Sequence, residues 1–226
     1  LYRRVGEAEV WSERHEEAAP EPTPWEEQPM PDNLIDNSVV ERYAGLEGRD
    51  LIKSILRDYP GKTALVSSFG AESAVLLHMI SEVDPDLPVI FLDTGKLFQE
   101  TLDYRDKLIV ELGSQMIHFK NRARDASKLR SVKPEAFDIL AYDATGLLHQ
   151  SNTDACCHIR KTIPLEKALA KFDVVISGRK RFHGAARADL DYVSIADDRL
   201  KVEPLAGFSA LDIQSYMNSH HLPSHP

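Results

Sequence analysis

The chain has 226 residues, 42% of them hydrophobic and 28% charged, which is enough for one α/β domain with a buried core and excludes a wholly disordered chain. It contains no run of about 18 apolar residues and no charged-then-apolar leader after Leu1, so neither a membrane span nor secretion is expected. The net charge of −9 argues against a generic nucleic-acid binder, and two cysteines cannot form a disulfide framework. A cytoplasmic protein is therefore expected.

The first 40 residues form an acidic, proline-rich segment. Residues 1–36 contain ten acidic and three basic residues, five prolines and both tryptophans, Trp11 and Trp25. This composition is typical of irregular chain, and the tryptophans are candidate anchors on the main domain or on a second subunit. We predict an arm over residues 1–40 and one domain over residues 41–226.

After the arm, helical and strand patterns alternate. An amphipathic helix is predicted from residue 37 to residue 56. Short apolar runs predict strands at residues 63–66, 89–92, 116–119 and 174–177, and helical spacing predicts helices at residues 71–80 and 100–112. This alternation indicates a mostly parallel sheet with helices on both faces. Ligands bind beyond the carboxyl ends of such strands, so the turns after Val66, Leu92 and Ile176 are the expected functional positions.

The turn after the first strand reads SSFGAES, residues 67–73. Gly70 permits close approach of the backbone to a ligand, the serines supply hydroxyl donors, and the next helix directs free N–H groups at an anion. An ordinary serine-rich turn with a helix cap would explain the same residues, and both interpretations remain open for this turn alone.

The other two strand ends carry cations. Asp93-Thr94-Gly95-Lys96 follows the second strand, and Gly178-Arg179-Lys180-Arg181 follows the last one, with Arg187 farther on. Residues 156–187 hold eight basic and two acidic residues, which favours a small anionic ligand, although two solvated basic helix faces are the alternative. Because guanidinium groups match pairs of anion oxygens, we expect the three strand ends to converge on one anionic ligand.

Cys156 and Cys157 are adjacent, which leaves three interpretations: buried small side chains, a vicinal disulfide or metal ligands. Arg160 and Lys161 follow closely and would stabilise a thiolate, which favours a functional role. An iron–sulfur cluster requires about four thiolates, so these two residues cannot complete one.

Five segments together resemble the assimilatory adenylyl-sulfate and phosphoadenylyl-sulfate reductases: SSFGAES, LDTGKLFQET, CCHIRKTIPLEKAL, SGRKRFHGAAR and residues 200–226. The resemblance covers residues 63–226, and the CC-x-x-RK-x-x-PL pattern at residues 156–165 is its most specific part. It implies a Rossmann-like adenine nucleotide α-hydrolase (PP-loop) fold. It also implies reduction of adenylyl sulfate, or its 3′-phosphorylated form, to sulfite and a nucleotide, with thioredoxin or glutaredoxin as reductant, by an enzyme that forms a homo-oligomer.

The resemblance assigns roles to individual residues. The implied substrate-binding residues are Ser67, Ser68, Phe69, Gly70, Ala71, Glu72 and Ser73 in the PP-loop, Leu92, Asp93, Thr94 and Lys96 beside the adenosine, and Gly178, Arg179, Arg181 and Arg187 around the anion. Cys156 and Cys157 match the first two ligands of a [4Fe–4S] cluster, and Lys161 matches a lysine between cluster and substrate. This cysteine pair favours adenylyl sulfate. Residues 183–186 depart from the Gln-Ser pair that the family carries before the last arginine.

In the family, a CxxC completes the cluster and a mobile tail carries the nucleophilic cysteine. Neither lies within these 226 residues, so the resemblance places the nucleophile beyond Pro226. The implied mechanism is attack of the tail thiolate on the sulfate sulfur, loss of AMP, and release of sulfite from the S-sulfocysteine by an external thiol. Without the tail, these residues are expected to bind nucleotide without turnover.

Three other functions are considered. A phosphoadenylyl-sulfate reductase would prefer the 3′-phosphorylated substrate. A PP-loop adenylyltransferase would use ATP, but such enzymes show Ser-Gly-Gly-x-Asp-Ser, and Glu72 replaces the aspartate here. A nucleotide-binding module without turnover would keep the pocket alone.

Overall fold

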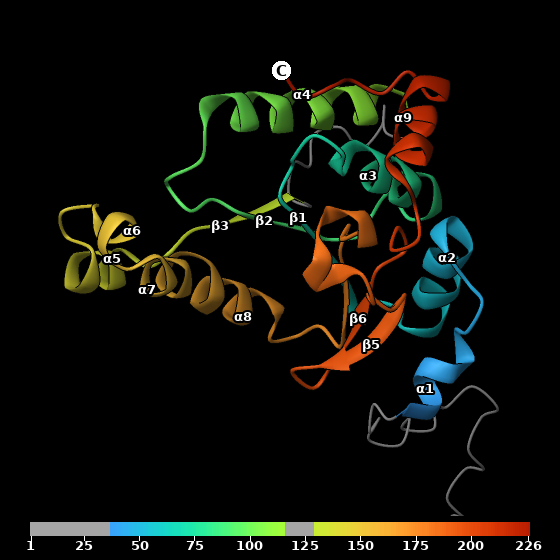
Figure 1. Cartoon of the computed structure of the whole chain (residues 1–226), viewed down its shortest axis with the longest axis horizontal. Helices are drawn as coiled ribbons and strands as arrows, with labels where there is room; N and C mark the ends of the chain where they lie inside the picture. The colour runs from blue at the N-terminus through green and yellow to red at the C-terminus, as the bar shows by residue number, and fades with distance from the viewer. Residues whose placement is uncertain (1–36, 116–128) are drawn as a thin grey trace, which may run out of the picture. The chain divides into compact units, whose positions relative to one another are not determined.

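The computed structural model describes residues 37–115 and 129–226 (Figure 1). The helices are α1 (Asn37–Arg42), α2 (Gly48–Asp58), α3 (Ser73–Val83), α4 (Gln99–Gln115), α5 (Ala136–Tyr142), α6 (Leu148–Ser151), α7 (Thr153–Cys157), α8 (Ile163–Leu169) and α9 (Ala210–Ser219). The strands are β1 (Thr63–Ser67), β2 (Val89–Leu92), β3 (Leu129–Val132), β4 (Val174–Ile176), β5 (Val193–Ala196) and β6 (Arg199–Val202). Among these described residues, no helix combines the length and apolar character needed to cross a membrane.

The described strands form one sheet in the order β3-β2-β1-β4-β6-β5. Neighbouring strands are parallel, except that β5 and β6 pair antiparallel at the edge. This confirms the predicted mostly parallel α/β fold. The β5–β6 hairpin was not predicted; its turn is formed by Asp197 and Asp198, both with positive φ (54° and 55°), the backbone geometry that suits a tight two-residue hairpin.

Helices cover both faces of the sheet. Successive residues of each strand point to opposite faces, so neighbouring residues of one strand pack into different cores. In β1, Leu65 packs into the larger core beneath α2, α3, α4 and α9, whereas Ala64 packs into a second cluster with Leu169 of α8. In β4, Ile176 packs into the larger core and Val175 packs into the second cluster. These strands are therefore buried on both sides, as their uninterrupted apolar runs predicted.

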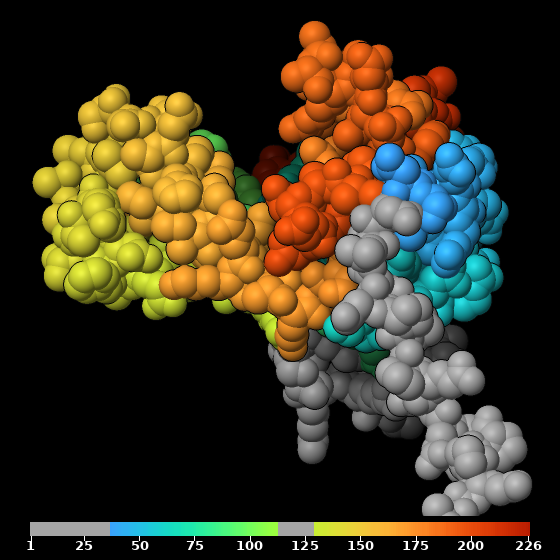
Figure 2. All heavy atoms as spheres, turned by 90° about the horizontal axis from the view of Figure 1, so that it is seen from below, coloured from blue at the N-terminus to red at the C-terminus, as the bar shows by residue number. Residues whose placement is uncertain are grey.

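The segment from α5 to α7 forms a lobe that projects from the rest of the described domain, in yellow in Figure 2. It leaves large apolar side chains exposed, among them Phe137 at 77% and Leu140 at 73%. The chain returns from this lobe through α8, whose Leu169 packs against Ala64 of β1 and Ile90 of β2.

One predicted helix differs from the structure, and one predicted strand lies outside the described residues. The single helix expected over residues 37–56 is two helices, because Gly45 adopts φ of +79° and Gly48 φ of +50°, conformations that interrupt helical backbone. Residue 40, where the arm was predicted to end, lies within α1, and the extent of the arm stays a prediction. The strand expected at residues 116–119 lies outside the described residues, and β3, which pairs with β2, begins at Leu129.

The strand order places a topological switch point between β1 and β4. From β1 the chain proceeds to β2 and β3 on one side, whereas β4 and β6 lie on the other side. Connections therefore leave the carboxyl ends of β1 and β4 in opposite directions, and a crevice opens where they part. Ligands bind in such a crevice, so the turns after Ser67 and Ile176 are the expected binding positions.

Candidate functional site

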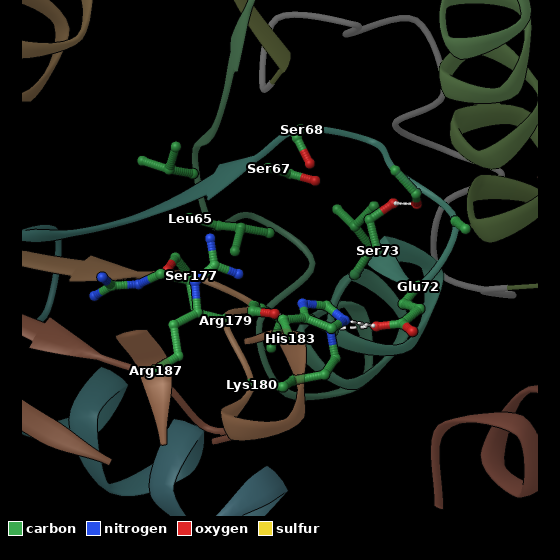
Figure 3. A pocket seen from close by; sticks show the side chains of 16 residues that line it. Leu65, Ser67, Ser68, Glu72, Ser73, Ser177, Arg179, Lys180, His183 and Arg187 are labelled. Carbon is green, nitrogen blue, oxygen red and sulfur yellow. Dashed lines mark hydrogen bonds and ion pairs between the residues drawn. The ribbon is translucent and has the colours of Figure 1, made fainter. Parts of the chain in front are cut away.

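A cavity of about 450 Å³ lies at this switch point (Figure 3). The turn after β1 lines one side with Ser67, Ser68, Gly70, Ala71, Glu72 and Ser73, and the segment after β4 lines the other with Ser177, Gly178, Arg179, Lys180, His183 and Arg187. Two of the three predicted strand ends thus meet at one cavity.

The turn between β1 and α3 is held by its own serines. The Ser67 hydroxyl accepts a hydrogen bond from the Phe69 amide at 3.2 Å, and the Ser73 hydroxyl donates to the Gly70 carbonyl at 2.6 Å. Ser73 opens α3, so the positive end of an 11-residue helix faces the cavity. Phe69 was predicted to bind substrate, but it is only 2% exposed and packs edge-on against Phe91 with ring centroids 5.4 Å apart. It supports the turn from below and does not line this cavity.

A carboxylate links the two sides of the cavity. The Glu72 Oε2 atom lies 2.9 Å from the Lys180 ammonium and 2.9 Å from His183 Nε2 (Figure 3). Lys180 is buried and also donates to the Gly178 carbonyl at 2.8 Å. Glu72 therefore fastens the turn after β1 to the segment after β4, and its charge balances that of Lys180. Lys180 and His183 were not among the predicted binding residues, although both lie inside the basic motif.

Arg179 and Arg187 are the guanidinium groups at the cavity. Arg179 is held by Glu203, a buried carboxylate that follows β6, with an Arg179 Nη2 to Glu203 Oε1 distance of 2.6 Å. Arg187 is exposed, and within residues 37–115 and 129–226 no carboxylate forms an ion pair with it. Of the three permanent cations at the cavity, Arg187 therefore carries the charge that no described acid balances.

Arg181 was predicted to contact the anion, but the structure places it elsewhere. Its Nε donates to the Leu190 carbonyl at 2.9 Å, and its guanidinium lies over the Tyr192 ring, 5.0 Å from the centroid. The Arg181 amide also bonds the Ala206 carbonyl. Arg181 thus braces the segment that carries the other cations and does not line the cavity.

The end of β2 does not line this cavity either, so two of the three strand ends meet there, and contact of Leu92, Asp93, Thr94 and Lys96 with a nucleotide stays a prediction. Thr94 and Lys96 instead bond the lobe and the turn that follows it: the Lys96 ammonium donates to the Gly146 carbonyl at 2.8 Å, and the Thr94 carbonyl accepts from Arg160 Nη1, just after α7, at 2.8 Å. Asp93 pairs with Lys133 at 3.3 Å. Leu92 is half-buried at the strand end, where Val132 of β3 is its register partner.

The last residues of the sequence run along α4 (Figure 1). The Tyr104 hydroxyl of α4 donates to the Pro223 carbonyl at 2.8 Å, and the Tyr104 ring packs against His225 with centroids 4.9 Å apart. Pro226 is exposed, its carbonyl lies 2.9 Å from His225 Nδ1, and it does not line the cavity between β1 and β4. The nucleophilic cysteine expected beyond Pro226 lies outside the described residues and stays a prediction.

Arg160 connects the cysteine segment to the rest of the domain. Its Nη2 lies 2.5 Å from Asp143 Oδ2, both side chains are buried, and Asp143 also accepts from the Leu148 amide at 2.9 Å. Hydrogen bonding to Arg160, then to the Leu148 amide, holds the pKa of Asp143 below its ordinary value. The sequence predicted that Arg160 would stabilise a neighbouring thiolate, but its charge is committed to Asp143.

The cysteines lie at the end of α7, where the backbone passes into a π-helical turn, His158–Thr162. Cys156 is buried, Cys157 is half-buried, and both are free thiols, so the vicinal disulfide is not formed. Lys161 is exposed. Within the described parts of the chain, no group of three or more His, Cys, Asp or Glu side chains is arranged to hold a metal ion. Two thiolates form half of the set that a [4Fe–4S] cluster needs, so these residues do not fit a whole cluster.

The Asp143–Arg160 pair predicts a specific pH dependence. Because the pKa of Asp143 is lower in the folded state, its contribution to stability is complete above the ordinary aspartate value of 3.8 and is lost as the pH falls through the lower, folded value. We expect the difference in melting temperature between the wild type and Asp143→Asn to shrink between about pH 6 and about pH 3. A difference that stays constant over this range would contradict the assignment.

Comparison with known proteins agrees with this fold. Residues 62–226 match the family described as the phosphoadenosine phosphosulfate reductase domain. An adenosine 5′-phosphosulfate reductase of Mesorhizobium japonicum is 42% identical over 199 residues, which cover 84% of this chain and 74% of that protein. One of Chelativorans sp. is 37% identical over 187 residues, covering 82% of this chain and 71% of that protein.

A solved structure shows the same fold. The phosphoadenylyl-sulfate reductase from Candida auris, in a phosphate complex, superposes with a TM-score of 0.63 at 18% identity, covering 84% of this chain and 90% of that one. At this identity the likeness concerns the arrangement of helices and strands only. The family match over residues 62–226, together with the 42% identical relative, shows that the chain belongs to the phosphoadenosine phosphosulfate reductase family.

Proposed function

We propose that the chain binds adenylyl sulfate in the cavity between β1 and β4 and acts in its reduction to sulfite and AMP. The observation that carries this proposal is the meeting, at one cavity, of the amino-terminal end of α3 with Arg179, Lys180 and Arg187. A helix amino terminus and guanidinium groups both favour phosphate and sulfonate oxygens. The names of the Mesorhizobium and Chelativorans relatives support adenylyl sulfate as the substrate.

In the proposed reaction, the residues of the cavity bind and orient the phosphosulfate. An incoming thiolate attacks the sulfonate sulfur, the bond from sulfur to the phosphate oxygen breaks, and AMP leaves with the electron pair. Arg187 and the α3 amino terminus stabilise the charge that gathers on the leaving phosphate. A thiolate of thioredoxin or glutaredoxin then attacks the cysteine sulfur of the resulting S-sulfocysteine. A disulfide forms between the two proteins, and sulfite departs. The first thiolate belongs to a tail cysteine beyond Pro226, outside these 226 residues.

The cysteine pair is proposed as half of an iron–sulfur site. Cys156 and Cys157 would supply two thiolates and segments outside this sequence the other two. Lys161, exposed one turn after the pair, is proposed to add positive charge between the cluster and the substrate. No step of the reaction passes through the cluster, and the adjacent free thiols are consistent with a reducing cytoplasm.

Calorimetric titration of the 226-residue chain with four nucleotides tests the proposed substrate. We expect adenylyl sulfate to bind, AMP to compete with it, and both phosphoadenylyl sulfate and ATP to bind more weakly. Because the assay measures binding, it does not depend on the tail cysteine. Tighter binding of phosphoadenylyl sulfate would assign the chain to the 3′-phosphorylated substrate, and binding of ATP alone would overturn the proposal.

A further inference from the structure

Glu203 is a buried carboxylate whose contacts all serve the segment after β4. Its side chain is only 2% exposed. The Ser177 hydroxyl lies 2.8 and 2.7 Å from the two carboxylate oxygens and shares its one proton between them, and the Arg179 amide donates to Oε2 at 3.1 Å. Arg179 Nε donates to Oε1 at 2.8 Å, and Arg179 Nη2 lies 2.6 Å from the same atom. Such full pairing is what a buried charge requires.

The sheet register places Glu203 at this point. Ile176 of β4 pairs with Val202 of β6, and the ladder continues one step farther, where the Ser177 amide donates to the Val202 carbonyl at 2.9 Å. Ser177 and Glu203 therefore leave the sheet side by side. The Glu203 amide donates to the Tyr192 carbonyl at 2.8 Å, so the backbone beneath the carboxylate is also held.

Arg179 is the exposed partner. Nearly half of its side chain, 45%, is accessible, and it lines the cavity between β1 and β4. A long exposed arginine ordinarily samples several rotamers, and fixing it costs conformational entropy. Glu203 holds Nε and Nη2, which lie on one edge of the guanidinium, so the Nη1 donors are not consumed by this contact. The group is thereby oriented before any ligand binds.

We infer that Glu203 is a positioning residue that holds Arg179 in place for the anionic part of the nucleotide, an inference that rests on the proposed function. The Glu203 charge also repels an anion, which opposes this effect. Water screens that repulsion at the exposed edge of Arg179, whereas the two-point contact acts directly on the guanidinium. The positioning effect should therefore exceed the repulsion.

A double-mutant cycle on adenylyl sulfate binding tests the inference. The variants are Glu203→Gln, Arg179→Ala and the pair together, measured by calorimetry on the 226-residue chain. Glutamine keeps the size of glutamate but cannot accept all of these hydrogen bonds. We expect Glu203→Gln to raise the dissociation constant about tenfold. Once Arg179 is alanine, the same substitution should have no further effect, because its action requires the guanidinium.

Thermal unfolding and two more variants separate positioning from a general structural role. Glu82→Gln removes a carboxylate that pairs with Arg49 between α2 and α3, away from the cavity, and should leave binding unchanged. If Glu203→Gln does not fold, Glu203→Asp replaces it in the double-mutant cycle, because aspartate keeps the charge but its shorter side chain does not reach Arg179 in the same way. Additive losses, or unchanged or tighter binding in Glu203→Gln, would overturn the inference. Failure of the wild type to bind adenylyl sulfate would instead overturn the proposed function.

Discussion

Replacement of Arg160 by methionine is expected to lower the free energy of unfolding by about 3–5 kcal/mol, the loss that follows when one partner of a buried ion pair is removed. The Arg160 and Asp143 side chains are only 8% and 1% exposed. Methionine fills much of the volume but leaves the carboxylate without its cation and the Thr94 carbonyl without its donor. Urea unfolding followed by circular dichroism measures the change.

Lys161→Met is the matched control, because Lys161 is the next residue of the same π-helical turn and is exposed. It should change stability by less than about 0.5 kcal/mol. The double variant Arg160→Met/Asp143→Leu should be more stable than Arg160→Met alone, because no unpaired charge remains. Equal stability of Arg160→Met and the wild type would show that the contacts of Arg160 do not hold the cysteine segment to the domain.

Replacement of Arg187 by alanine is expected to weaken adenylyl sulfate binding by about 10- to 100-fold, the range for a lost hydrogen bond to a charged group. Arg187 lines the cavity, and its charge is balanced by no acid in the described ranges 37–115 and 129–226. Binding of an anion there disrupts no existing ion pair, so the binding free energy gained from the new contact is not reduced by the loss of an old one. Calorimetry at one fixed salt concentration measures the effect.

Arg57→Ala is the control for this substitution. Arg57 is an exposed arginine of α2, paired with Asp58 and outside the cavity, so its loss changes the net charge equally. Its binding should match the wild type. If Arg57→Ala weakened binding as much as Arg187→Ala, the effect would come from the overall charge of the protein and not from a contact in the cavity.

Much of the fold and part of the site could be predicted from local sequence patterns. The strands at Thr63–Ser67, Val89–Leu92 and Val174–Ile176 are short apolar runs bounded by turn residues, and their burial on both faces follows from those runs. The carboxyl ends of parallel strands lie at one edge, so SSFGAES and the basic segment were expected to meet. These inferences need only the order of residues and the geometry of a parallel sheet.

Other features depend on partners that are distant in the chain. Glu203 lies 24 residues after Arg179, and only the pairing of β4 with β6 brings the two together. Arg160 binds Asp143, 17 residues earlier, a contact that no local pattern reports. Phe69 lies within the turn motif, but its positive φ of 51° turns the ring into the core.

The sequence by itself therefore determined the class of fold, because apolar periodicity and turn chemistry are local properties, and its motifs carried the resemblance that indicated the family. It predicted that three strand ends would converge, of which two line the cavity. Only the tertiary structure decided which charges in the motifs are paired within the protein. Arg179, Lys180 and Arg160 pair with Glu203, Glu72 and Asp143, whereas Arg187 pairs with no acid among the described residues and Arg179 keeps its Nη1 donors for a ligand. Charge pairing is a property of distances in space, and residues from separate strands and helices acquire those distances only when the sheet has formed.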